Sequence, residues 1–180
     1  METSNMWWKN LIDKTKNIFQ SEEEDVVVWE EGLNAENVAE RFELIKQSYL
    51  SAYDHYNKDI FKSHIKIAPE LVKGNYAVEG HNPVEAENSY FGHISIRVYD
   101  HNLVDATWKI GFSEQGQYGS GFMTDEYIAM NFSSSPIAES ADGFVIFKMK
   151  DRETLEGLWL ESGCFLPGYE ICKLKNRLED

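Results

Sequence analysis

The chain has 180 residues, of which 42% are hydrophobic and 13% aromatic, and these values predict one globular domain, or one domain with an appendage. The 31 acidic residues outnumber the 17 basic ones, so the formal net charge is −14. Such a charge repels phosphate groups. We therefore do not expect the protein to bind nucleic acid or an anionic membrane surface through a basic patch. A basic protein would suit this surface, although the charge also serves solubility alone.

Apolar residues recur at helical spacing in the first 73 residues, which we expect to form a helical segment packed on the rest of the chain. The first stretch predicts a helix at about residues 4–20, followed by an acidic run that indicates a solvated linker. The second predicts a helix near 35–62 with Asn34 as its N-cap. The stripe expected to face the core consists of Val38, Phe42, Ile45, Tyr49, Ala52 and Tyr56.

The N-terminus carries neither an apolar run of signal-peptide length nor a transmembrane stretch of about 20 residues. With Met1 as the native start, we therefore expect a cytoplasmic protein. The two cysteines, Cys164 and Cys172, flank a Pro-Gly turn slightly out of register. Two free thiols are favoured over a disulfide.

Glycines recur from residue 74 onward at the edges of short apolar or alternating runs, which is typical of an antiparallel meander. Eight runs without helices between them favour an up-and-down barrel or a strongly curved sheet. The expected fold class is α+β, with a barrel over 74–174 and a tail at 175–180. The expected strands are 75–80, 90–98, 103–111, 116–122, 127–132, 143–149, 155–160 and 168–174.

Motifs in this β part carry a likeness to a known family. They include Tyr76-x-Val78-Glu79-Gly80-x-Asn82-Pro83, Tyr90-x-Gly92-x-Ile94-x-Ile96, Trp108-x-Ile110-Gly111, Gly119-x-Gly121, Leu155-x-Gly157-x-Trp159 and Gly168-x-Glu170. Over about the C-terminal 100 residues, the chain resembles a largely uncharacterised family of bacterial domains, sometimes labelled fibronectin-binding. The resemblance implies a lipocalin- or avidin-like barrel and supplies no catalytic residues. Fibronectin binding would need an exported protein, and we do not carry it over.

Residue patterns typical of catalysis or metal binding do not occur in the sequence. The glycines around 116–121 lack the Lys-Ser/Thr ending of a phosphate loop, and Ser120 is not in a nucleophile elbow. Neither an H-E-x-x-H nor a C-x-x-C motif is present, so we expect no metal, no cofactor and no enzymatic activity. His81 and His93 could meet if their strands pair.

Two binding functions remain as hypotheses. The first is an acidic protein-interaction module, such as an inhibitor or immunity-type protein for a basic partner. Its candidate contacts are Trp7, Trp8, Glu22, Glu23, Glu24, Glu85 and Glu87. The alternative is a small apolar or aromatic ligand in the barrel interior or mouth. Its candidate contacts are Tyr76, Glu79, Asn82, Tyr90, Trp108, Tyr127 and Trp159.

Overall fold

The structure is a computed structural model that describes residues 33–53, 60–82, 89–111, 116–137, 140–164 and 166–178. The expected helix at 4–20 and the acidic linker lie outside these residues. In the described part, no helix combines the length and the apolar character needed to cross a membrane.

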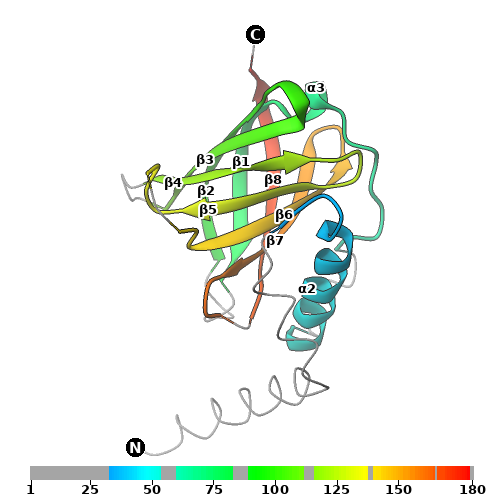
Figure 1. Cartoon of the computed structure of the whole chain (residues 1–180), viewed down its shortest axis with the longest axis vertical. Coiled ribbons are helices and arrows are strands. Elements are labelled where there is room, and N and C mark those ends of the chain that lie inside the picture. The colour runs from blue at the N-terminus through cyan, green and yellow to red at the C-terminus, as the bar shows by residue number, and fades with distance from the viewer. Residues whose placement is uncertain are drawn as a thin grey trace, which may run out of the picture. The chain divides into compact units, whose positions relative to one another are not determined.

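Eight antiparallel strands form a closed barrel in which each strand pairs with the next and β1 pairs with β8 (Figure 1). The sheet is therefore closed, as an up-and-down barrel requires. β8 runs three residues beyond the expected strand end, so the expected tail at 175–180 begins as strand. The strands are β1 Gly74–His81, β2 Ser89–Val98, β3 Leu103–Ile110, β4 Gly116–Met123, β5 Ile128–Ser133, β6 Gly143–Asp151, β7 Thr154–Glu161 and β8 Gly168–Arg177.

Alternation along the strands separates an apolar interior from an outer face. In β2, for example, Ile94 and Ile96 are buried in the barrel core, whereas the flanking His93 and Arg97 are exposed and Ser95 between them is half-buried. This is the period of two that a half-buried strand imposes. The direction of each side chain, and hence the composition of the interior, therefore follows from strand phase.

Several glycines lie inside strands rather than at their ends, which corrects the expectation that they only punctuate the meander. Gly80 of β1 is paired with Tyr90 of β2, and a Cβ at Gly80 would lie 2.1 Å from the Tyr90 ring. Gly157 of β7 is paired in the same way with Phe147 of β6. These glycines allow an aromatic ring to lie over the backbone of the neighbouring strand. Gly111 does mark a turn, with a φ of 65°.

One end of the barrel is closed by α3, Pro69–Val72, which lies at the top of Figure 1. The Tyr76 hydroxyl donates a 2.6 Å hydrogen bond to the carbonyl of Val72. Arg177, at the end of β8, donates to the carbonyl of Leu71 and to the Tyr76 hydroxyl. The interior at this end is consequently filled by side chains.

The longer helix, α2, spans Val38–Ala52 and packs on the outside of the barrel. Phe42 contacts Tyr127 with ring centroids 5.4 Å apart, and Tyr49 contacts Tyr169 at 5.8 Å. The helix is shorter than the expected 35–62.

The two ends of α2 account for this difference. At its start, the Asn34 side chain accepts N–H groups of the preceding turn, and Asn37 is the N-cap. At its end, Tyr53 is the C-cap, and Phe61 has a φ of 57°. Tyr53 ends the helix because its φ of −122° and ψ of 48° are not helical, and further along the chain the Phe61 N–H donates to Glu156 in the barrel wall.

Candidate functional site

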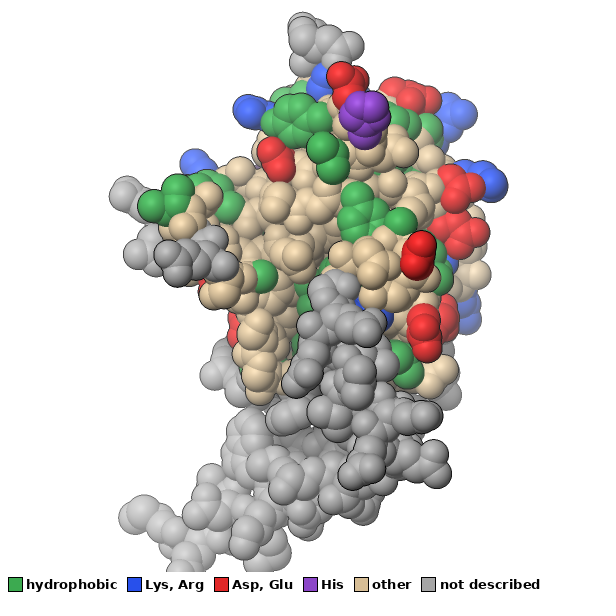
Figure 2. Space-filling model, viewed as in Figure 1, with side chains coloured by type: hydrophobic (Ala, Val, Ile, Leu, Met, Phe, Trp, Pro, Cys, Tyr) green, Lys and Arg blue, Asp and Glu red, His purple; other side chains and the backbone are tan. Residues whose placement is uncertain are grey.

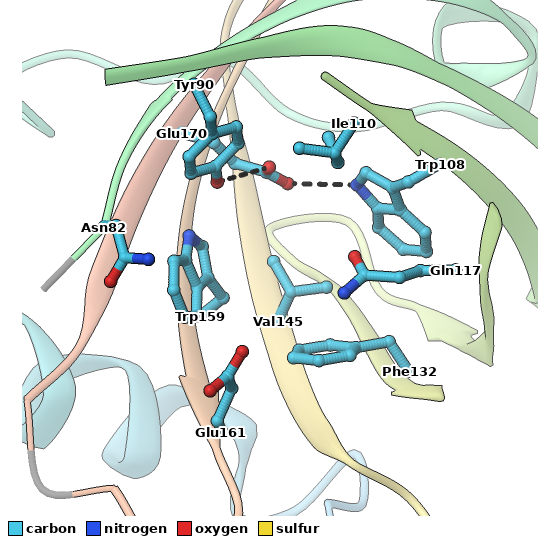
Figure 3. Close-up of a pocket in the computed structure, with 10 residues that line it drawn as sticks. All are labelled: Asn82, Tyr90, Trp108, Ile110, Gln117, Phe132, Val145, Trp159, Glu161 and Glu170. Atoms are coloured by element: carbon cyan, nitrogen blue, oxygen red, sulfur yellow. Dashed lines mark hydrogen bonds between the residues drawn. The ribbon is translucent and has the colours of Figure 1, made fainter. Parts of the chain in front are cut away.

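A pocket of about 240 Å³ enters the barrel at the end opposite α3 (Figure 3). Its lining comes from the ends of strands on all sides of the barrel, so the sheet itself forms the walls. The volume lies below the roughly 300–1,000 Å³ of drug-sized sites. The lining residues are Asn82, Tyr90, Trp108, Ile110, Gln117, Phe132, Val145, Trp159, Glu161 and Glu170.

Glu170 of β8 lies in the wall of this pocket and is 3% exposed. Its carboxylate accepts a hydrogen bond of 3.1 Å from the Tyr90 hydroxyl and one of 3.3 Å from Trp108 Nε1. The Cα partners of Glu170 on the two neighbouring strands are Gly80 and Gly157, and the rings of Tyr90 and Phe147 lie over these glycines. The glutamate is thus held at a defined place inside the barrel.

Burial raises the pKa of Glu170 to about 7, because an apolar interior disfavours the charged form. The hydrogen bonds from Trp108 and Tyr90 act in the opposite direction and lower it less. Glu170 therefore changes charge near neutral pH.

Trp159 of β7 carries a buried indole N–H that makes no hydrogen bond of normal geometry within the described part of the chain. Its ring lies over Gly168 of β8, where an added Cβ would be 2.0 Å from Trp159 Cε2. Figure 3 shows this indole nitrogen on the side of the ring that faces Tyr90 and Glu170. A buried donor without an acceptor costs about 1–3 kcal/mol, and the Trp159 N–H is only partly satisfied, through its interaction with the Tyr90 hydroxyl.

No lysine, arginine or histidine belongs to the described lining of the pocket. Burial and the neighbouring Glu170 raise the pKa of Tyr90 well above its usual value, and the same two causes raise that of Cys172. Both groups stay neutral at physiological pH. The charge of the pocket therefore comes from Glu170 and from the exposed Glu161 at its rim.

The structure brings four of the predicted ligand contacts to this pocket, namely Asn82, Tyr90, Trp108 and Trp159. Tyr76 points inward at the closed end of the barrel instead. Glu79 is exposed on the outer face, because it has the opposite phase to Val78 and Gly80.

Tyr127 lies outside the barrel, between Phe42 of α2 and the Lys148 ammonium group. Tyr127 comes just before β5 and is not one of the inward-facing residues of that strand. It was predicted as a ligand contact only because it is aromatic.

The predicted site residues did not include Glu170, Glu161, Gln117, Ile110 or Val145, which the structure places in the pocket. The signal for Glu170 was present, since it has the same strand phase as Gly168 and Cys172. A glutamate on the inward phase of a barrel strand is buried and needs partners.

A second buried glutamate, Glu156 of β7, lies on the outer side of the barrel wall. It accepts hydrogen bonds from Lys150 Nζ at 2.9 Å, the Tyr169 hydroxyl at 3.1 Å and the Phe61 N–H at 3.1 Å, and His64 Nε2 lies 3.3 Å away. Burial favours a higher pKa, but the bonds from His64, Lys150 and Phe61 together lower it to about 2. Glu156 is therefore a structural anchor for residues 60–64.

The predicted partner contacts Trp7, Trp8, Glu22, Glu23, Glu24, Glu85 and Glu87 all lie outside the described residues. Figure 2 shows one face of the described surface, where acidic side chains alternate with lysines and arginines along one side. The centre of that face is mostly uncharged. A wider, polar depression of about 660 Å³ crosses the outside of the barrel from Ser95 to Asn131, and it contains none of the predicted contacts.

His81 and His93 do not meet. His81 is paired with Ser89 and His93 with Ala77, which places them four residues apart along the ladder. Among the described residues, no three His, Cys, Asp or Glu side chains are grouped as metal ligands would be. In the same part of the chain both cysteines are free, with Cys172 buried in the core. Burial and Glu161 raise the pKa of Cys164.

No protein-family model matches the chain, and no curated protein does. Among solved structures, the chain is similar to a redesigned beta barrel, mFAP1, bound to DFHBI. The identity is 14%, the alignment covers 60% of this chain and 98% of that one, and the TM-score is 0.43. Similarity at this level carries no argument about function. The antiparallel barrel that the family resemblance implied is present, whereas membership of that family stays a prediction.

Proposed function

We propose that this protein binds a small, planar, largely apolar molecule in the mouth of its barrel and does not act as an enzyme. The observation that carries the proposal is an open pocket lined by four aromatic rings, with the buried Glu170 carboxylate and the buried Trp159 indole N–H among its polar groups. Barrels of eight strands have interiors that are either filled by side chains or sized for one small ligand. Here one end is filled and the other is open.

The lining supports this ligand class. Tyr90, Trp108, Phe132 and Trp159 contribute aromatic rings, and Ile110 and Val145 contribute aliphatic surface. Apolar walls with a few placed polar groups are characteristic of small-molecule sites. The volume limits the ligand to about one or two fused rings. Within the described lining there is no serine, threonine, cysteine or histidine, and both oxygens of the Glu170 carboxylate are held by hydrogen bonds from Tyr90 and Trp108.

The test uses indole as a neutral probe, with binding measured by ligand-observed NMR and calorimetry. We expect saturable binding that Ile110→Trp weakens about tenfold or more, because the larger side chain narrows the entrance. Leu103→Trp is the matched control, since Leu103 lies on the same strand but is 54% exposed and belongs to no described pocket. No saturable binding to the wild type, or equal losses in both variants, would contradict the proposal.

We retain an acidic protein-interaction role as a second proposal, which the net charge of −14 supports. A cytoplasmic location belongs to the same hypothesis. Association with a co-purified basic partner should slow steeply with added salt, because charged surfaces steer encounter. A rate that is independent of salt, in the wild type and in a Glu22/Glu23/Glu24→Gln variant, would rule it out.

A further inference from the structure

We infer that the ligand of the pocket carries a protonated amine on a small aromatic ring, and that Glu170 pairs with this cation. The inference rests on the proposed function and specifies the chemistry of its ligand. It stands on the position of one carboxylate relative to an open cavity and four aromatic side chains.

Glu170 has no cationic side chain beside it in the described lining of the pocket. Glu170 is 3% exposed, and the groups that hold it are a phenol and an indole, which are neutral. By contrast Glu156, equally buried in the same barrel, has Lys150 at 2.9 Å. A buried carboxylate without a cation is costly, so a ligand that supplies one gains the pairing energy. An ionised carboxylate has about four acceptor sites, and two hydrogen bonds leave acceptor capacity toward the cavity.

The rings and charges that line the pocket also favour a cationic ligand. Trp108, Trp159 and Tyr90 are the ring types that attract cations to their faces. Glu161 adds a negative charge at the rim, and the described lining holds no positive one. An anionic ligand would meet two carboxylates and no compensating group. The lining therefore discriminates against acids and in favour of amines.

The affinity of the pocket for an amine should also depend on pH. The titratable groups that face Glu170 are Tyr90 on β2 and Cys172 on its own strand, and Glu161 stands at the rim on β7. Tyr90 and Cys172 remain neutral because their pKa values are raised. The ionisation of Glu170, with a pKa of about 7, consequently sets how the affinity for an amine depends on pH.

The experiment compares three probes with one indole ring: tryptamine (cationic), tryptophol (neutral) and indole-3-propionate (anionic). Calorimetry should give the tightest binding for tryptamine and the weakest for indole-3-propionate. The affinity for tryptamine should rise about tenfold between about pH 6 and pH 8, because the ionised fraction of a carboxyl with a pKa of about 7 changes by that factor. Tryptamine itself stays protonated, as a lysine-like amine does.

Two variants assign the effect to Glu170. Glu170→Gln should reduce the affinity for tryptamine about tenfold or more, remove its pH dependence and change tryptophol binding by less than about threefold. Glu153→Gln removes an exposed charge near the closed end and should leave all three affinities unchanged. Tyr90→Phe keeps the carboxylate, so it should keep the amine preference even if Glu170→Gln folds poorly.

Equal binding of tryptamine and tryptophol would overturn the cation inference while leaving the proposed function intact. Tryptophol binding that weakens as the pH rises would also overturn it, since a neutral ligand would then be using the protonated carboxyl. Failure of all three probes would count against the proposed function itself.

Discussion

Two glutamates in one barrel show how the neighbours of a side chain decide its charge. Glu156 and Glu170 are both almost fully buried, on β7 and β8. Glu156 faces outward to a lysine and a histidine, and its pKa falls to about 2. Glu170 faces inward to neutral donors, and its pKa rises to about 7. The first is therefore a fixed anion, whereas the second responds to pH near neutrality.

Gly168 should be essential to the position of Trp159. In Gly168→Ala, the new Cβ would lie 2.0 Å from the indole ring, so the ring has to move out of its present position. Overpacking of this kind costs about 1–3 kcal/mol, and we expect weaker indole binding together with lower stability. Urea unfolding and probe calorimetry measure the two effects. An unchanged affinity would mean that the position of the Trp159 ring does not shape the pocket.

Strand phase made part of the site predictable from the sequence. Trp108 and Trp159 lie in alternating runs, and both face the interior as alternation predicts. Which end of the barrel is open was not predictable. It depends on α3 and on the contact between Arg177 and Tyr76, which are about 100 residues apart in the chain. Glu170 was missed because its burial depends on two glycines on neighbouring strands.

At the scale of elements, α2 covers an apolar outer face of the barrel that would otherwise be exposed to solvent. On β6 and β7, Ile146 and Leu158 have the outward phase and are nevertheless fully buried. Phe42 supplies the contact on the helix side, with Phe61 at 5.0 Å and Lys148 5.2 Å from its ring. The helix is thus part of the core structure of the domain.

Replacing Phe42 should be far more damaging than replacing another apolar residue of the same helix. Phe42→Ala removes a side chain with 0% exposure and should lower the free energy of unfolding by about 3–5 kcal/mol. Leu50→Ala is the control, because Leu50 is 37% exposed, and its loss should stay within about 1 kcal/mol. Urea unfolding decides between them. Similar small losses in both variants would show that α2 contributes little to stability.

Elements were predictable where a local pattern is strong. The eight strands follow from alternation and turn residues, and the closed ladder matches an up-and-down barrel. The end of α2 was not predictable, since the periodic stripe continues beyond Ala52. Tyr53 already has a non-helical conformation, and the next described residues, from 60 onward, are held by Glu156, a residue distant in sequence.

For the whole molecule, we expect maximal stability near about pH 5 rather than at neutral pH. The folded protein holds a proton on Glu170 that the unfolded chain releases, so stability falls as the pH rises from about 4.5 to about 7. Glu156 acts in the opposite sense, and its contribution is lost as the pH falls from about 4.5 through about 2. Self-repulsion from the net charge of −14 also weakens as carboxylates become protonated.

Urea unfolding across this range tests the balance. Glu170→Gln should flatten the decline between about pH 5 and pH 8, which amounts to about 3 kcal/mol in the wild type. Glu156→Gln should flatten the acid side instead. A wild-type profile that rises steadily to pH 8 would contradict the assignment of Glu170, and a profile that stays flat between about pH 2 and pH 4.5 would contradict that of Glu156.

The pairing of β1 with β8 has a consequence for how the chain folds. Seven of the eight ladders join strands that follow one another, whereas the last joins Gly74 to Arg177 across almost the whole barrel sequence. Contacts of such long range slow folding, because the entropy of closing a long loop is lost before the contact forms. During synthesis β1 cannot complete its pairing until β8 has emerged. Until then the free edge of β1 and the free edge of the last strand formed are open to pairing with other chains. The ladder that seals the barrel is therefore the step at which the nascent protein is most exposed to misassembly.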